Sequence, residues 1–513
     1  MTGSRRVLQV GCGPSGVSLL RQLLPRLAWA GAEARVEVCD PAEMGPGLAF
    51  STPYDLHLLN VRAGLMSLSP DDRGEFARWR ARRAAPALSA SPGGATPGGV
   101  AGPGGANGTD TADTADTADY PPRRLFGDYA CTVLAETVRT ARDAGQPVDL
   151  SAERAVALCP AGAGRWRARF SSGRSAVYST VILALGHLPS RRYAGAEGGP
   201  SFLSSPWGDL ALPAGHTVGI IGTRLTAIDA ALALRERGHT GRIIMASRSG
   251  RLPSVKGRVV LPELSLLPRF VRGHRTGTAT LYQVAEVIGR EIEAAEERPI
   301  DWAAALHPPP TTSAELRRDL ESADSPWQSV LTAIVPWVPD LWRILDPPGR
   351  DLFMSSYLSL WAGRIASFPA ITAGRLLEMM DSGQLTVRGA LAAVEPSGAR
   401  HRMRFDDGPH LDADLIINAT GPGYGPDSLA ANPLTAHLIR TGLATPHRHG
   451  GIAVDLHTLE VTGADGRPGK GLHVIGDLTR GEFLATNAVV NSVRQSVELA
   501  DVVSGRLTRA SCR

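Results

Sequence analysis

The chain has 513 residues, of which 43% are hydrophobic and 20% charged, and its formal net charge is +4. This length exceeds the roughly 250–300 residues at which single cores stop growing, so two or three domains are expected. The composition is that of an ordinary globular protein, and the positive net charge suits anionic cofactors or a carboxylate substrate but is too small to argue for nucleic-acid binding.

The first element predicted along the chain is a dinucleotide-binding βαβ unit. Residues 7–16, VLQVGCGPSG, precede an apolar helical run and a strand that ends in Asp40. The glycines permit a tight turn, the approach of a pyrophosphate and close packing of helix on strand, while the acid would meet a ribose. The cofactor-binding residues expected here are Gly11, Gly13, Pro14, Ser15, Gly16 and Asp40.

Residues 41–67 form a segment longer than a simple connection needs, with polar residues between apolar ones. We expect it to cross the active site, where Asn60, Arg62 and Ser67 could reach a bound ring or substrate. A solvated loop is the alternative interpretation.

Residues 86–119 consist almost entirely of Ala, Gly, Pro, Ser, Thr and Asp and end in a repeated Asp-Thr-Ala triplet. Because little here can be buried to offset the ordering entropy, we predict a disordered insertion. In the helix predicted after it, Arg123 or Arg124 could contact a phosphate or a carboxylate, or lie exposed.

A second βαβ unit begins at Thr217. Gly222 and Ala227 occupy the first and third positions of the glycine pattern, but Arg224 replaces the middle glycine, so either the nucleotide shifts or the guanidinium takes the phosphate charge. Arg248 stands where an NAD site would carry an acid, and an arginine there accommodates the 2′-phosphate of NADP. We therefore expect NADPH, bound by Gly222, Thr223, Arg224, Thr226 and Arg248.

Helices are predicted beyond this unit. The apolar spacing of 281–297 indicates an amphipathic helix, and 327–361 is rich in Trp and Leu. We interpret the latter region as a helical insert that roofs a substrate site, with Arg364 as a candidate carboxylate partner.

The end of the chain is expected to rebuild the first domain. Residues 413–422 form a strand ending in Ala-Thr-Gly, and 471–477 form a strand that runs into Asp477, followed by a helix through Val502. The acid can accept ribityl hydrogen bonds, and the helix N-terminus can face the pyrimidine of a reduced flavin. We therefore assign FAD to the first unit, with Gly476, Asp477 and Asn487 completing its site.

The predicted fold is α/β, with two Rossmann-like dinucleotide-binding domains, one for FAD and one for NADPH, and a helical insert. The expected division is 1–215 and 386–513 for the FAD-binding domain, 216–325 for the NADPH-binding domain and 326–385 for the insert.

The first strand begins by Val7, which leaves no room for a signal peptide, and no apolar run reaches the roughly 18 residues of a membrane span, so we expect a cytoplasmic protein. The five cysteines form no CxxC pair, and the HxH pair of His447 and His449 lacks further ligands. No metal site is therefore predicted.

The segments GCGPSG, LNVRAGLMS, PPRRLFGDY, VILALGHLP, IIGTRLTAID, ASRSGRLP, INATGP and VIGDLTRGEF together resemble the FAD- and NADP-dependent oxidoreductases with two dinucleotide-binding domains. Within that group the chain looks like the flavin N-hydroxylating monooxygenases, and it is similar to the aspartate N-monooxygenases that make nitrosuccinate in natural-product pathways. Relatives usually carry glycine at position 224 and often proline at position 62.

The resemblance implies that NADPH reduces FAD and that O₂ is then used to oxygenate a small amine or amino acid, with L-aspartate as the first candidate. Arg62, Arg123 and Arg364 are expected to bind a substrate carboxylate, and Asn60 and Arg62 are the expected catalytic residues near the flavin ring. No nucleic-acid or membrane partner is expected, and a homo-oligomer is left open.

Two alternatives also stay open. One is an NADPH-dependent flavin oxidoreductase or electron-transfer flavoprotein that does not oxygenate its substrate. The other is a non-catalytic FAD-binding scaffold, which Arg224 would favour if its side chain blocks NADPH.

Overall fold

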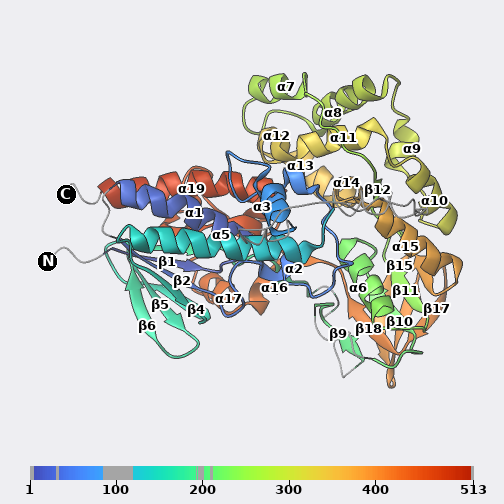
Figure 1. The fold of residues 1–513 in the computed structure, drawn as a ribbon, viewed down its shortest axis with the longest axis horizontal. Helices are drawn as coiled ribbons and strands as arrows, with labels where there is room; N and C mark the ends of the chain where they lie inside the picture. The colour runs from blue at the N-terminus through green and yellow to red at the C-terminus, as the bar shows by residue number, and fades with distance from the viewer. Residues whose placement is uncertain are drawn as a thin grey trace, which may run out of the picture.

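The computed structural model describes residues 5–30, 34–84, 120–191, 193, 201–207 and 212–509. The chain forms a sheet flanked by long helices near its two termini, a second sheet, and a group of helices beside the second sheet (Figure 1). This arrangement confirms the predicted α/β fold class with a helical part. The predicted insertion at 86–119 lies outside the described residues.

The first sheet has six strands in the order β20-β21-β7-β1-β2-β3, and only β20 and β21 pair antiparallel. Both ends of the chain contribute to it. Its strands are β1 (Arg5–Val10), β2 (Ala34–Cys39), β3 (Val148–Ser151), β7 (Thr180–Leu183), β20 (Glu460–Thr462) and β21 (Pro468–Val474).

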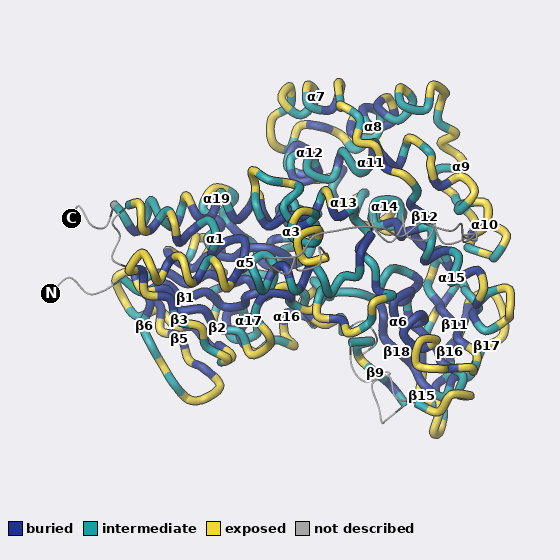
Figure 2. The backbone as a smooth tube through the Cα atoms, in the orientation of Figure 1, coloured by how far each residue is buried: buried dark blue, intermediate teal, exposed yellow. Residues whose placement is uncertain are grey.

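Three helices pack along one face of this sheet, α1 (Pro14–Trp29), α5 (Arg123–Asp143) and α19 (Val489–Arg509), and α1 contacts both others. A small antiparallel sheet lies on the other side (Figure 1), formed by β4 (Ala155–Pro160), β5 (Trp166–Phe170) and β6 (Ser175–Tyr178). Because the sheet is covered on both faces, most residues of its central strands are buried (Figure 2).

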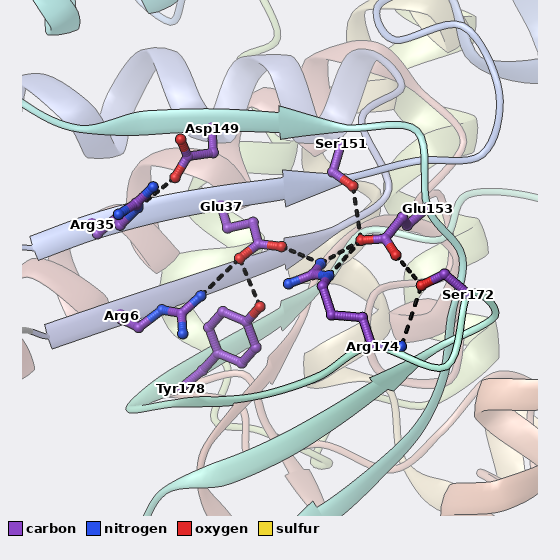
Figure 3. A network of polar contacts seen from close by, with 9 residues as sticks. All are labelled: Arg6, Arg35, Glu37, Asp149, Ser151, Glu153, Ser172, Arg174 and Tyr178. Atoms are coloured by element: carbon purple, nitrogen blue, oxygen red, sulfur yellow. Dashed lines mark hydrogen bonds and ion pairs between the residues drawn. The ribbon is translucent and has the colours of Figure 1, made fainter.

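A buried carboxylate joins the two sheets of this domain (Figure 3). Glu37 on β2 accepts hydrogen bonds from Arg6 at 3.0 Å and from the Tyr178 hydroxyl at 2.7 Å, and it also pairs with Arg174. Arg174 in turn pairs with Glu153. Two arginines therefore neutralise a carboxylate that is only 6% exposed.

The second sheet has five parallel strands in the order β14-β11-β10-β18-β9. They are β9 (Phe202–Leu203), β10 (Val218–Ile221), β11 (Ile243–Ala246), β14 (Leu385–Arg388) and β18 (Leu415–Asn418). Helices α6 (Leu225–Glu236) and α15 (Ala370–Asp381) pack on it, and β15 (Leu391–Ser397), β16 (Arg400–Phe405) and β17 (Gly408–Ala413) form an antiparallel sheet beside it.

The expected assignment of the whole of 386–513 to the first domain is therefore wrong at its start. β18, the predicted strand that ends in Ala-Thr-Gly, pairs with β10 and not with β1. Its four residues and those of β7 are equally buried, so their pattern does not indicate which sheet they join. The first domain resumes after this strand, with β20, β21 and α19.

The helical group begins well before residue 326, the start expected from the sequence. Val284 and Val287 of α8 share a core with Leu331 and Trp342 because the apolar face of α8 packs on α11. The group comprises α7 (Leu267–Gly273), α8 (Leu281–Glu296), α11 (Pro326–Ile334), α12 (Val338–Ile344), α13 (Pro347–Leu352), the π-helix η4 (Phe353–Tyr357) and α14 (Leu358–Ile365), with α9 (Trp302–Leu306) and α10 (Ser313–Glu321) leading toward the second sheet.

Short elements complete the described chain: α2 (Gly47–Phe50), η1 (Ala63–Leu65), α3 (Glu75–Ala84), β8 (Leu188–Pro189), β12 (Val255–Lys256), η3 (Val335–Trp337), β13 (Phe368–Pro369), β19 (Pro422–Gly423), α16 (Pro426–Ala431), α17 (Pro433–Arg440), η5 (Gly476–Thr479) and α18 (Arg480–Phe483). Among all the described residues, no helix is both long and apolar enough to cross a bilayer.

Candidate functional site

The two predicted glycine turns have the same construction in the two sheets. Gly11 has φ +94° and Gly222 has φ +120°, which are left-handed values that favour glycine. The Gly11 N–H donates to the carbonyl of Cys39 at 2.8 Å, and the Gly222 N–H donates to that of Ala246 at 2.7 Å. Each glycine therefore turns the chain from its first strand into the following helix while remaining bonded to the second strand.

Both helices that follow begin without a side-chain cap. Gly13 precedes α1 and Arg224 precedes α6, each in an extended conformation with ψ −171°. The first N–H groups of these helices are thus left for an anion, which the helix dipole also favours. Pro14 takes the first position of α1, and a Cβ on Gly16 would lie 2.7 Å from the Gly11 carbonyl oxygen, so close packing requires glycine there.

Asp40 lies directly after β2, beside the first turn. Its Oδ2 accepts the N–H of Cys12 at 2.8 Å and its Oδ1 accepts that of Ala42 at 2.9 Å. A carboxylate has about four lone-pair sites, so two remain for ribose hydroxyls. The turn, the uncapped helix and this acid fit the dinucleotide expected at the first site.

Asp477 is buried at the end of β21 and forms an ion pair that was not expected from the sequence. His187, which follows β7, places Nε2 2.8 Å from Asp477 Oδ2, and Thr486 donates to Oδ1 at 3.0 Å. Burial by itself would raise the pKa of Asp477, but His187 and Thr486 outweigh it and lower that pKa. Burial likewise opposes the charge on His187, yet Asp477 raises the pKa of the imidazole above its usual value.

Gly476 adopts φ +77°, and a Cβ on it would lie 3.3 Å from the Ser15 hydroxyl. The predicted FAD residues Ser15, Gly476 and Asp477 are therefore brought together where α1 begins and β21 ends. His187 could have been suspected from its position after the strand that ends in Ala-Leu-Gly, but its partner lies almost 300 residues further along the chain.

A cavity of about 2180 Å³ opens beside the second glycine turn. Its wall combines the 48–73 segment of the first domain, the strand-end loops of the second sheet, the helical group and the start of α19. Of the predicted site residues, those that line it are Asn60, Ser67, Arg123, Gly222, Thr223, Arg224, Thr226, Arg248, Arg364 and Asn487. Leu48, Ala49 and Phe50 also line the cavity, whereas the first glycine turn is not part of its wall.

Arg224, in place of the middle glycine, turns toward the helical group. Its guanidinium donates to the carbonyl of Ser359 and, at 2.9 Å, to the Ser359 hydroxyl. Nη1 is buried without a hydrogen-bond partner, and burial lowers the pKa of this arginine. The side chain thus lies beside the nucleotide turn with donor capacity unused.

The three arginines expected to bind substrate are placed very differently. Arg123 forms an ion pair with Asp229 on α6, so its charge is already neutralised within the protein. Arg62 donates to the carbonyl of Val259 at 2.6 Å and does not line the cavity. Arg364 lines it, donates to the Ser254 hydroxyl at 3.3 Å and lies 5.3 Å over the ring of Trp327.

Several cations that were not selected from the sequence also line the cavity, namely Arg73, Arg251, Lys256, Arg480 and Arg494. Burial and then the neighbouring charge of Arg364 lower the pKa of Arg251, whose Nε is buried without a partner. Lys256 donates from Nζ to the carbonyl of Asn60 at 3.0 Å. One signal in the sequence could have identified this residue, because the chain contains only two lysines.

His447 and His449 are engaged elsewhere. His449 lies 2.8 Å from Asp351, and His447 lies 3.4 Å from Glu482. Within the described ranges, no three His, Cys, Asp or Glu side chains come together as a metal site would need.

Residues 9–188 match the model of a protein family described as FAD-NAD(P)-binding. This match confirms the prediction of an FAD/NAD(P)-binding domain. No curated protein sequence matches the chain.

Solved structures with the same overall arrangement include an ornithine N-hydroxylase from Kutzneria sp. 744, captured with reduced FAD, NADP⁺ and L-ornithine, at 15% identity and a TM-score of 0.52. An L-lysine 6-monooxygenase from Pseudomonas syringae is 14% identical with a TM-score of 0.51, and an ornithine hydroxylase from Pseudomonas aeruginosa is 15% identical with a TM-score of 0.50. Each likeness covers 98% of this chain and 99% of the other. At such identities the likeness establishes the fold.

Proposed function

We propose that the chain is an FAD-dependent, NADPH-using monooxygenase that N-oxygenates a small amino substrate, with L-aspartate as the first candidate. The observation that carries the proposal is the pair of equivalent glycine turns in separate sheets, with one large cavity whose wall combines both domains and the helical group. Two dinucleotides and a small substrate are what such an arrangement can hold.

FAD would be held by the N-terminus of α1, by the free lone pairs of Asp40 and by the region around Gly476 and Asp477. NADPH would be held by the turn from Gly222 to Thr226, with Arg248 for its 2′-phosphate. When bound and reduced by NADPH, FAD supplies the electrons that activate O₂. The protein's part is to bind the partners, orient them and exclude water.

The substrate carboxylate would be bound by Arg364 and Arg251. Both line the cavity, and neither forms a close ion pair like that of Arg123 with Asp229, although the charge of Asp319 acts on Arg364. The charges of Arg251 and Arg364 repel each other, and a ligand with two carboxylates would relieve this repulsion most because it can pair with both guanidiniums. A dicarboxylic amino acid therefore suits this wall better than a diamine, whose second ammonium group would be repelled.

The test begins with the purified protein, which should contain FAD and lose its yellow colour with NADPH, faster than with NADH, in the absence of oxygen. In air, L-aspartate should give an N-oxygenated product in proportion to the NADPH consumed. Hydrogen peroxide as sole product with every amine tried would contradict the monooxygenase assignment. Product from ornithine or lysine but not from aspartate would overturn only the dicarboxylate part.

The same experiment separates the alternatives. An oxidoreductase or electron-transfer flavoprotein would be reduced by NADPH but would yield no oxygenated amine. A scaffold would bind FAD and remain yellow with NADPH, as expected if Arg224 blocked the second site.

A further inference from the structure

Lysine is almost absent from this chain. Of the 54 Lys and Arg residues, only Lys256 and Lys470 are lysines. Lys470 is exposed, whereas Lys256 is only 4% exposed and lines the cavity. Arginine stays protonated, so it can supply a positive charge but no lone pair. The ε-amine of lysine can also lose its proton and then present a lone pair.

The surroundings of Lys256 hold its nitrogen in place without a countercharge. Nζ donates to the carbonyl of Asn60 at 3.0 Å, which fixes the amine on the cavity wall. β12 packs against β13, α10 and α15. Asp319 of α10 accepts the N–H of Val255 and interacts with Arg364.

Most of the other charged groups on the elements around β12 contact partners other than Lys256. These charged groups are Glu315 with Arg318, Arg317 with Asp381, Glu378 with Arg235, Arg62 with the Val259 carbonyl, Asp324 with the Arg258 N–H, and Arg375 and Glu321 on the same helices. Burial alone lowers the pKa of Lys256, to about 8. The amine therefore exchanges its proton in the range where a general base is effective.

Resting on the N-oxygenation proposed above, this geometry suggests a role for the lysine. An amine reacts through its lone pair, so the substrate's ammonium group must first lose a proton. We propose that Lys256 accepts this proton: the neutral ε-amine takes one proton from the substrate ammonium, leaving a neutral substrate amine and a Lys256 ammonium, which later releases the proton to solvent. Asn60 is then a positioning residue, because its carbonyl orients Nζ.

The kinetic test compares Lys256→Met and Lys256→Arg with the control Lys470→Arg. Both Lys256 variants should lose about 100-fold in kcat/KM for the amine substrate, because neither side chain can accept a proton. The wild-type pH dependence near 8 should disappear, while anaerobic flavin reduction by NADPH and the Lys470→Arg enzyme should be unchanged. A Lys256→Arg enzyme within about 3-fold of the wild type would overturn the proposal in favour of a carboxylate-binding charge.

A second measurement does not depend on turnover. Protein labelled with [ε-¹³C]lysine should give two lysine signals in the NMR spectrum, and Lys470→Arg removes one and so assigns the other. The Lys256 signal should titrate near pH 8. At about pH 9, addition of an amine substrate should move the Lys256 signal toward the chemical shift of the protonated amine. Succinate, which has two carboxylates but no amine, should not move it. Equal shifts with both compounds would overturn the proposal.

The two measurements also separate this inference from the proposed function. If the wild type forms no amine-dependent product, the monooxygenase assignment fails and the base assignment fails with it. If the wild type forms product and Lys256→Met keeps the wild-type rate and pH profile, only the assignment of Lys256 fails.

Discussion

Gly11 and Gly222 hold the same position in two different sheets, and each is closed in by a backbone carbonyl that follows the adjacent strand. A Cβ on Gly11 would lie 2.2 Å from the carbonyl oxygen of Ala184, and a Cβ on Gly222 would lie 2.6 Å from that of Ala419. Both contacts are far below any real separation, so each turn excludes a side chain for the same reason.

Substitution of the two glycines should therefore affect the two cofactors separately. Gly11→Ala should cost at least about 2 kcal/mol of unfolding free energy, because of its positive φ and the clash, and should yield protein with little bound FAD. Gly222→Ala should retain FAD but resist reduction by NADPH. Flavin absorbance, anaerobic reduction rates and urea unfolding measure these effects.

Gly215→Ala is the matched control, because a Cβ there meets nothing within 4 Å. It should behave as the wild type in all three measurements. Loss of FAD from Gly222→Ala with normal FAD content in Gly11→Ala would reverse the cofactor assignment.

Arg248 should control the choice between NADPH and NADH. Arg248→Gln removes a charge that would bind the 2′-phosphate, and charge-assisted hydrogen bonds contribute about 1.5–3 kcal/mol each. The NADPH preference in kcat/KM should fall by roughly 10- to 100-fold, while the values for NADH stay near those of the wild type. Arg290→Gln, which removes an exposed i,i+4 pair with Glu286, is the control and should leave the preference for NADPH intact. An unchanged preference in Arg248→Gln would exclude Arg248 as the residue that binds the 2′-phosphate.

The ion pair between His187 and Asp477 should make part of the stability depend on pH. Because the pKa of His187 is raised in the folded protein, its contribution is complete below the unfolded pKa of histidine and is lost as pH rises through the folded value. The pKa of Asp477 is lowered in the folded protein, so the stability that its carboxylate contributes is lost only when the pH falls through the folded pKa of Asp477. His187→Gln should therefore lower the unfolding free energy more at pH 6 than at pH 9. Urea unfolding at both pH values measures this difference. An equal or larger loss at pH 9 would contradict the ion pair.

The buried Glu37 network should stabilise the first domain without affecting the cavity (Figure 3). Glu37→Gln leaves Arg6 and Arg174 facing a neutral amide, and breaking a buried pair in this way costs about 3 kcal/mol. Arg35→Gln, which breaks the exposed pair with Asp149, should cost much less, because exposed ion pairs contribute little to stability. Similar costs for both variants in urea unfolding would show that the network contributes no more than a surface pair.

Lys256 should destabilise the protein at neutral pH. Its pKa is lowered on folding, so the unfolded chain binds more protons between about pH 8 and the ordinary lysine range, and stability rises with pH there. The unfolding free energy of the wild type relative to Lys256→Met should therefore increase by about 2–3 kcal/mol between pH 7 and pH 10.5. The same comparison with Lys470→Met should show no such change, and a constant difference for Lys256→Met would argue against a buried titrating amine.

The local parts of this protein follow from its sequence. Both βαβ units, their glycine turns and the acid after β2 are readable because strand, turn and helix depend on residues within about 30 positions of one another. Gly11, Gly222 and Asp40 can therefore be assigned to turns and strand ends from the order of residues alone.

Only the tertiary structure decides which distant segments meet. β18 joins the second sheet although its residues resemble those of β7, Arg123 is neutralised by Asp229, and Lys256 reaches the Asn60 carbonyl. Each of these relations joins residues separated by more than 100 positions and depends on the packing of whole domains, which short-range patterns of hydrophobic and charged residues do not encode. The sequence alone determines that two βαβ units with glycine turns exist, and the packing of the two sheets and the helical group decides which cations face the cavity beside the second turn.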